Sequence, residues 1–185
     1  MFVQAFRVFP SEGVILGRLL TGCTDIEYQL CLRAGMGGGD VEKAITDIFS
    51  KRGETRRVNI ADKPGGDGYA AAGLGTEFDE AIEDMFLCLK IRNQYAHCIW
   101  HDDRSGKLAF AHMEIASPTG PGADPFNLTF KYVDVPLLNQ QEQFFFYTRD
   151  NLNYLNYRRR QIVGDISAGA IPRTPTKIAR PPLHP

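Results

Sequence analysis

The chain has 185 residues, of which 43% are hydrophobic and 23% are charged, the size and composition of one soluble globular domain. The formal net charge is −1, which argues against a polycation that coats nucleic acid with its whole surface. No stretch approaches the roughly 20 apolar residues of a membrane-spanning helix, and charged side chains near the start of the chain argue against a secretory signal. We therefore expect a cytoplasmic protein with no membrane contact.

The four cysteines, Cys23, Cys31, Cys88 and Cys98, lie far apart and form no CxxC pair. This spacing favours reduced thiols and lacks the close ligand pairs of a zinc site, so we predict neither a metal nor another cofactor. Charge is unevenly distributed, because residues 146–185 carry seven Lys and Arg against two Asp, a net +5, which leaves −6 for the rest. A basic C-terminal quarter is typical either of an anionic partner or of a solvated helix end and tail.

Several segments have the periodicity of amphipathic helices. Apolar side chains recur at helical spacing over 12–34, with Ser11 as a predicted N-cap. The glycine run at 35–39 is expected to end this helix, and Asp40 to cap a short helix over 41–51.

The strongest helical pattern covers residues 76–98, where Phe78, Ile82, Phe86 and Leu89 form one apolar stripe. A last helix is predicted over 139–163. Residues 53–75 contain two glycine-rich blocks and are interpreted mainly as a loop, which lacks the Gly-Lys-Ser/Thr of a phosphate-binding loop.

Alternating residues at 107–116 and 127–135 predict two strands with a long Pro- and Gly-rich connection. This hairpin, about 107–135, must pack on the helices because two strands alone are marginally stable. Residues 164–185 contain five prolines, which predict a basic tail that is disordered or lies on a partner. The sequence thus predicts a mainly α fold, with a helical domain over 1–163, an inserted β-hairpin and a Pro-rich C-terminal tail.

The most informative segment is Arg92-Asn93-Gln94-Tyr95-Ala96-His97. The apolar stripe of its helix continues through positions 93 and 97, which hold Asn and His and lie on one helix face. Arg92 continues a neighbouring row. An unsatisfied polar group in a dry core costs about 1–3 kcal/mol, so these side chains are expected to face a polar cavity, a partner or one another.

This segment resembles the motif of the HEPN superfamily (higher eukaryotes and prokaryotes nucleotide-binding domain), in which an Arg, often followed by Asn, precedes a His by four to six residues. Here the match is Arg92-Asn93-x-x-Ala96-His97, and the order of the predicted helices is also similar. The resemblance covers about residues 12–163, although only the motif helix is specific. It implies a HEPN-like helical bundle that acts as a homodimer and as a metal-independent endoribonuclease, with 2′,3′-cyclic phosphate products.

In this interpretation His97 transfers protons, Arg92 holds the phosphate, and Asn93 orients the phosphate or fixes the His tautomer. Two copies of the chain would supply two histidines, one for each proton transfer. The resemblance also implies a toxin or defence effector held by an antitoxin or another protein partner. One alternative is a non-catalytic HEPN-like module that binds a nucleotide or a partner. Another is a structural or interaction protein whose tail docks on a partner.

Each residue of the motif also has a structural interpretation. His97 suits a helix C-terminus, where the helix dipole favours its cation. Arg92 could form a salt bridge to the first helix through Glu27, and Asn93 could end its helix with a hydrogen bond.

Further candidates for substrate binding are aromatic and basic. Tyr95 and Trp100 could stack on RNA bases or pack against a neighbouring helix. Arg158 and Arg159 could follow an RNA backbone or complement the dipole of their own helix.

Overall fold

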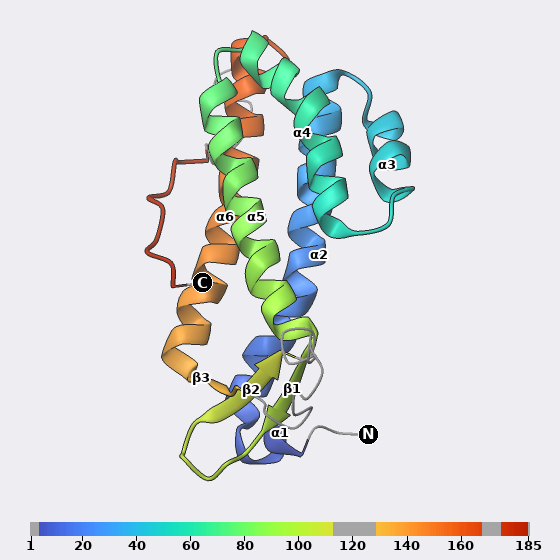
Figure 1. Ribbon diagram of the computed structural model, residues 1–185. Helices are drawn as coiled ribbons and strands as arrows, with labels where there is room; N and C mark the ends of the chain where they lie inside the picture. Colours follow the sequence, from blue (N-terminus) through green and yellow to red (C-terminus); the bar gives the residue numbers. More distant parts are fainter. Residues whose placement is uncertain (1–3, 113–128, 168–174, 185) are drawn as a thin grey trace.

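The computed structural model describes residues 4–112, 129–167 and 175–184 (Figure 1). These residues form six helices and three strands. The helices are α1 (Ala5–Val8), α2 (Pro10–Gly38), α3 (Val41–Phe49), α4 (Glu54–Ala71), α5 (Gly75–Ala96) and α6 (Val135–Ile162), and the strands are β1 (Cys98–His101), β2 (Leu108–His112) and β3 (Lys131–Val133).

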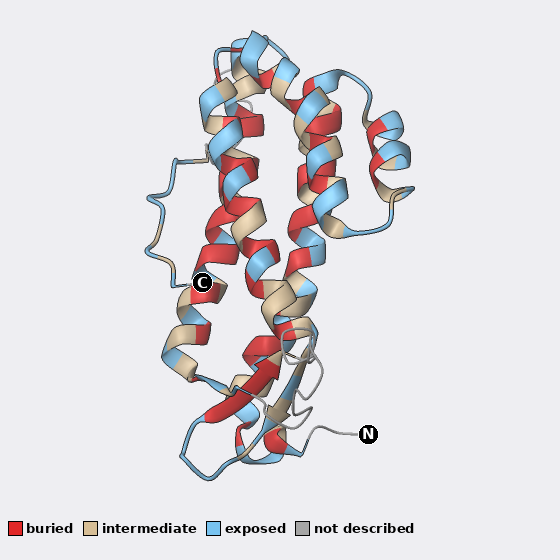
Figure 2. Ribbon diagram, in the orientation of Figure 1, coloured by how far each residue is buried: buried red, intermediate tan, exposed pale blue. Residues whose placement is uncertain are grey.

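The long helices α2, α4, α5 and α6 lie side by side, and their buried faces enclose the core (Figures 1 and 2). The largest fully buried side chains include Tyr69, Phe78 and Phe144. All four cysteines are free thiols, and three of them are buried. The prediction of a mainly helical fold is therefore confirmed, and the predicted helices correspond to α2, α3, α5 and α6.

Helix α2 differs from the prediction at both ends. It begins at Pro10, so Ser11 lies inside the helix, and it continues through the glycine run to Gly38. The glycines do not end the helix because they allow close packing: a Cβ on Gly35 would lie 2.7 Å from the Cα of Val41. The predicted cap of α3 is correct, since the Asp40 carboxylate accepts a hydrogen bond from the backbone N–H of Lys43 at 2.8 Å.

The three strands form an antiparallel sheet in the order β1-β2-β3 at the end of the molecule where α5 stops (Figure 1). Strands β2 and β3 are the predicted hairpin, whereas residues 113–128 of its connection lie outside the described part of the chain. Strand β1 was not predicted, because its apolar residues follow the helical stripe of α5 without a break. In the sheet Trp100 lies opposite Phe110, and Cys98 lies opposite His112.

The interpretation of residues 53–75 as a loop is wrong, because Glu54–Ala71 form helix α4 with Pro64 inside it. Glycine and proline have low helix propensity, but packing against α2 overrides it. At this contact a Cβ on Gly68 would lie 2.0 Å from the carbonyl oxygen of Gly37. The glycines therefore permit a close approach of two helices.

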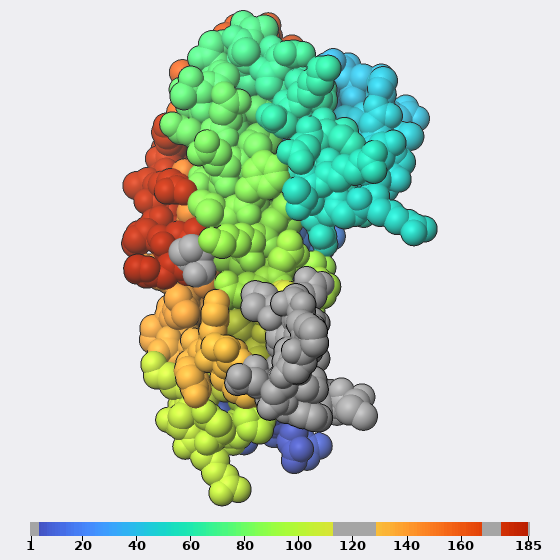
Figure 3. All heavy atoms as spheres, viewed as in Figure 1, coloured from blue at the N-terminus to red at the C-terminus, as the bar shows by residue number. Residues whose placement is uncertain are grey.

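Residues 175–184 have no regular secondary structure and lie along the outside of the body next to α5 and α6 (Figures 1 and 3). Nε and Nη2 of Arg180 each lie 2.8 Å from Oδ1 of the buried Asp84, and the guanidinium lies over the ring of Phe144. Gln141 donates a hydrogen bond to the carbonyl oxygen of His184 at 3.0 Å. For residues 164–185 we expected disorder or a partner; residues 168–174 and 185 lie outside the described part of the chain, whereas within 175–184 Arg180 meets a buried carboxylate of its own chain, which needs a counter-charge.

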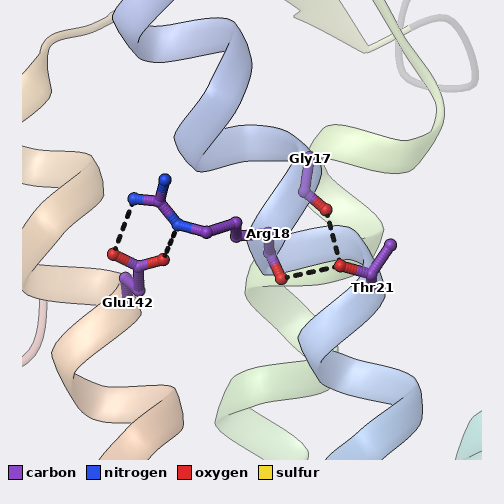
Figure 4. Close-up of polar contacts among 4 residues, drawn as sticks. All are labelled: Gly17, Arg18, Thr21 and Glu142. Carbon is purple, nitrogen blue, oxygen red and sulfur yellow. Dashed lines mark hydrogen bonds and ion pairs between the residues drawn. The ribbon is translucent and has the colours of Figure 1, made fainter.

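An exposed ion pair joins the two longest helices (Figure 4). Arg18 of α2 donates from Nε and Nη2 to the carboxylate of Glu142 on α6, with 3.0 Å between Nη2 and Oε2. One turn further on, Thr21 donates its hydroxyl to the carbonyl oxygen of Gly17 at 2.9 Å. Because Arg18 is exposed to solvent, the pair orients the helices more than it stabilises them.

Candidate functional site

The Arg-Asn-His motif lies at the C-terminal end of α5, where the helix gives way to β1 (Figure 1). His97 is the first residue beyond the helix, with φ −115° and ψ 26°. Its side chain is exposed, whereas Arg92 and Asn93 are half-buried. The apolar stripe of α5 thus turns polar where the helix reaches the surface, in agreement with the cost of burying such groups in a dry core.

Two acceptors hold Arg92. Its Nη2 lies 3.1 Å from Oε1 of Glu54, the first residue of α4, and its Nη1 donates to Oδ1 of Asn93 at 2.9 Å. The salt-bridge interpretation is therefore correct in kind, but Glu27 is not the partner. Glu27 is buried and pairs with Arg57 at 3.0 Å; burial raises the pKa of this carboxyl, and Arg57 opposes the shift.

His97 stands apart from the other two motif residues. Within the described part of the chain no hydrogen bond or ion pair joins it to Arg92 or Asn93. Its aromatic neighbour is instead His112 at the end of β2, with ring centroids 6.3 Å apart and ring planes at 61°. The strand register produces this contact, because Cys98, which follows His97, lies opposite His112. Sequence reasoning missed His112 because it did not predict β1.

The structure buries Tyr95 and packs Trp100 against the core. Tyr95 is only 2% exposed, and its hydroxyl donates to Oε1 of Gln141 at 2.8 Å. Burial raises the pKa of this hydroxyl to about 12. Trp100 is half-buried among the rings of Phe6, Tyr95 and Phe110, at centroid distances of 5.4 to 5.8 Å. Of the two interpretations, packing is the one observed, and in this arrangement Tyr95 cannot stack on a base.

Arg158 and Arg159 lie near the C-terminal end of α6, at the opposite end of the molecule from His97 (Figure 1). Helix α6 begins beside the sheet at Val135, so its axis covers about 35 Å before it reaches Arg158. Arg159 is engaged locally, with its Nη1 4.0 Å from Oδ2 of Asp165. The structure therefore separates these two predicted substrate-binding residues from the motif.

A different group of cations adjoins the motif. Residues 51–57, here called the basic segment, contain Lys51, Arg52, Arg56 and Arg57. Arg52 and Arg56 are exposed and form no ion pair with the described residues. Glu54 of the same segment contacts Arg92, so the basic segment adjoins the motif at this ion pair. The charge distribution along the sequence favours residues 146–185 as the contact for an anionic partner, and the basic segment lies outside that range.

A cavity of about 530 Å³ lies between the end of α2, helix α3 and helix α4. Its lining combines carboxylates, among them Asp40 and Asp67, with the amines of Lys43 and Lys63. No residue of the motif lines it, so the cavity is separate from the candidate site.

Comparisons with known proteins add no relative: no protein-family model matches the chain, and no match was found among curated proteins or solved structures. Among the described residues, no helix combines the length and apolar character needed to cross a membrane. The interpretation of the site therefore depends on its own residues.

Proposed function

We propose that the chain is a HEPN-like, metal-independent endoribonuclease that acts as a homodimer. The observation that carries the proposal is the placement of the motif. An exposed His97 follows the last residue of α5, about one turn beyond a hydrogen-bonded Arg92–Asn93 pair, and the basic segment contacts Arg92 through Glu54. Elsewhere along α5 the same stripe is apolar, and three of its members, Phe78, Ile82 and Leu89, are buried.

The chemistry of these side chains suits RNA cleavage. The reaction needs a group that takes the 2′-OH proton, a group that protonates the leaving 5′ oxygen, and a cation at the phosphate. His97 is of the only side-chain type that ordinarily titrates near neutral pH. Arg92 keeps its charge and can bind a phosphate bidentately, in exchange for the carboxylate of Glu54. Asn93 holds the guanidinium in place for that exchange.

Binding of RNA would begin with charge. Arg52 and Arg56 offer sequence-independent attraction to a phosphate backbone. In the homodimer, the motif helices of two copies would face one cleft. Such an enzyme endangers the cell that makes it, so we also propose a protein partner, such as an antitoxin, that holds it inactive.

One contact favours the second candidate function, a non-catalytic module that binds a nucleotide or a partner. Arg92 already has a carboxylate partner in Glu54. A guanidinium held in this way could simply join α4 to α5. The substitution Glu54→Gln separates two roles of Arg92: if Arg92 binds phosphate, the affinity for a single-stranded RNA should rise several-fold, whereas a purely structural pair would give a lower melting temperature and unchanged affinity.

The decisive experiment compares purified wild type, His97→Ala and His101→Ala on mixed cellular RNA in EDTA, with analysis of the 3′ ends. His101 is the matched control because it is an exposed histidine in the same sheet. We expect cyclic-phosphate ends from wild type and His101→Ala and none from His97→Ala. If all three proteins leave several RNAs intact while dimers are present in the same samples, the nuclease proposal is wrong.

A further inference from the structure

The apolar stripe of α5 and the buried face of β2 each end in a histidine, and the two histidine rings are neighbours. The stripe of α5 runs into His97, and the face of β2 that buries Leu108 and Phe110 runs into His112, since residues two apart in a strand share a face. We propose that His112 is a second catalytic residue, and that His97 and His112 of one chain form the acid–base pair for RNA cleavage. This inference rests on the proposed ribonuclease function and deepens it, because both proton-transfer groups then come from one subunit.

The distance between the rings suits a shared phosphodiester. The centroids of these rings are 6.3 Å apart, and Nδ1 of His112 has no hydrogen-bond partner within the described residues. In cleavage, the attacking 2′ oxygen and the leaving 5′ oxygen lie on opposite sides of one phosphorus, and each must come within about 3 Å of its catalytic nitrogen. Two rings separated in this way can reach both oxygens.

The environment of one ring nitrogen of the half-buried His112 is also unusual for a purely structural histidine. Its Nδ1 is buried and has no hydrogen-bond partner among the described residues. An unpartnered buried nitrogen costs about 1–3 kcal/mol, which an apolar residue at this position of β2 would avoid. His97 beside it is exposed, so the pair can be reached from solvent.

The neighbouring strands contribute one thiol and one cation. Cys98 of β1 lies opposite His112, and Lys131 of β3 lies opposite Phe110 of β2. Burial raises the pKa of the Cys98 thiol to about 11, so this thiol stays neutral near pH 7, while the charge of Lys131 opposes the shift. The pair therefore has a cation nearby, which favours the approach of a phosphate.

The proton and bond balance of the step is complete. One imidazole accepts the proton of the 2′-OH as the 2′ oxygen bonds to phosphorus. The bond between phosphorus and the 5′ oxygen breaks, and the other histidine, as imidazolium, gives its proton to the 5′ oxygen. The products are a 2′,3′-cyclic phosphate and a 5′-hydroxyl, and the step consumes no metal, oxidant or further reactant.

The first test measures RNA cleavage by His112→Asn and His112→Gln, each of which keeps a polar group near one ring nitrogen but cannot titrate. We expect a loss of about 100-fold or more in rate, an unchanged melting temperature and the disappearance of one limb of the pH–rate profile. His101→Gln is the control and should keep both limbs. A folded His112→Asn and His112→Gln with wild-type rates would overturn the inference and leave the proposed function intact, whereas an inactive wild type would overturn both.

The second test asks whether the His97 and His112 that act on one RNA come from the same subunit. His97→Ala and His112→Gln subunits are unfolded together and refolded as mixed dimers, and their RNA cleavage is measured. If both histidines act within one chain, no mixed dimer contains a complete pair, and the activity stays at the level of the single variants. If the pair is shared between subunits, mixed dimers contain one complete site, and about a quarter of the wild-type activity returns, which would contradict the assignment to one chain.

Discussion

From the close contact between α2 and α4 we predict that the substitution Gly68→Ala destabilises the protein. The Cβ of the new alanine would lie 2.0 Å from the carbonyl oxygen of Gly37 and 2.7 Å from its Cα. Both atoms belong to a helix backbone, so no side-chain rotation can relieve the collision. The two helices would have to separate at a contact that organises the core.

The matched control lies in the same helix. A Cβ on Gly66 would meet only Oδ1 of Asp62, at 4.0 Å. Gly66→Ala should therefore show the ordinary gain in helix propensity, a stabilisation of about 1 kcal/mol. Gly68→Ala has the same gain, but overpacking costs about 1–3 kcal/mol and occasionally more. We expect the collision to dominate and Gly68→Ala to be the less stable of the two variants by about 2–3 kcal/mol.

Urea denaturation measures this difference, with circular dichroism for the helices and the fluorescence of Trp100, the only tryptophan, for the core. The comparison needs unchanged m-values in both variants, so that the two midpoints report free energies of unfolding. If Gly66→Ala and Gly68→Ala stabilise the protein equally, the reasoning fails, because α4 would then not lie against α2 at Gly68.

Two further predictions concern buried polar groups. Arg180→Gln should lower the free energy of unfolding by about 1–3 kcal/mol at pH 7, because the buried carboxylate of Asp84 loses its cation. Burial already raises the pKa of Asp84 above 3.8, so the folded state holds the carboxyl proton more tightly than the unfolded state does. Stability therefore falls as the pH rises through the titration of Asp84 in the folded state. At pH 4 a larger share of Asp84 is protonated and needs no cation, so the effect of Arg180→Gln should be smaller there than at pH 7. If Arg180→Gln lowers the free energy of unfolding equally at pH 4, or still lowers it in the Asp84→Asn background, this account is wrong. Lys177→Gln on the same tail is the control and should leave the free energy of unfolding unchanged. Tyr95→Phe should cost about 1–3 kcal/mol, since it leaves the buried Oε1 of Gln141 without its donor; denaturation midpoints equal to wild type would show that this hydrogen bond contributes nothing.

The sequence alone was sufficient where a structure depends on neighbours along the chain. The stripe through Phe78, Ile82 and Leu89 predicted α5 because side chains three and four apart share one helix face. The same periodicity showed that Asn93 and His97 break an apolar pattern, and so identified the motif. The side-chain cap of α3 by Asp40 was also predictable, because it joins residues three apart.

Tertiary structure decided what depends on residues far apart. Helix α4 was missed because its glycines are unfavourable locally, and only the distant Gly37 shows why they are there. The partner of Arg92 is Glu54, and the neighbour of His97 is His112; neither contact follows from spacing along the chain. Local propensity and periodicity extend over a few residues, whereas these contacts arise when separate elements pack. The sequence by itself therefore determined the helical framework and the motif, and only the packing of that framework decided which groups surround the motif.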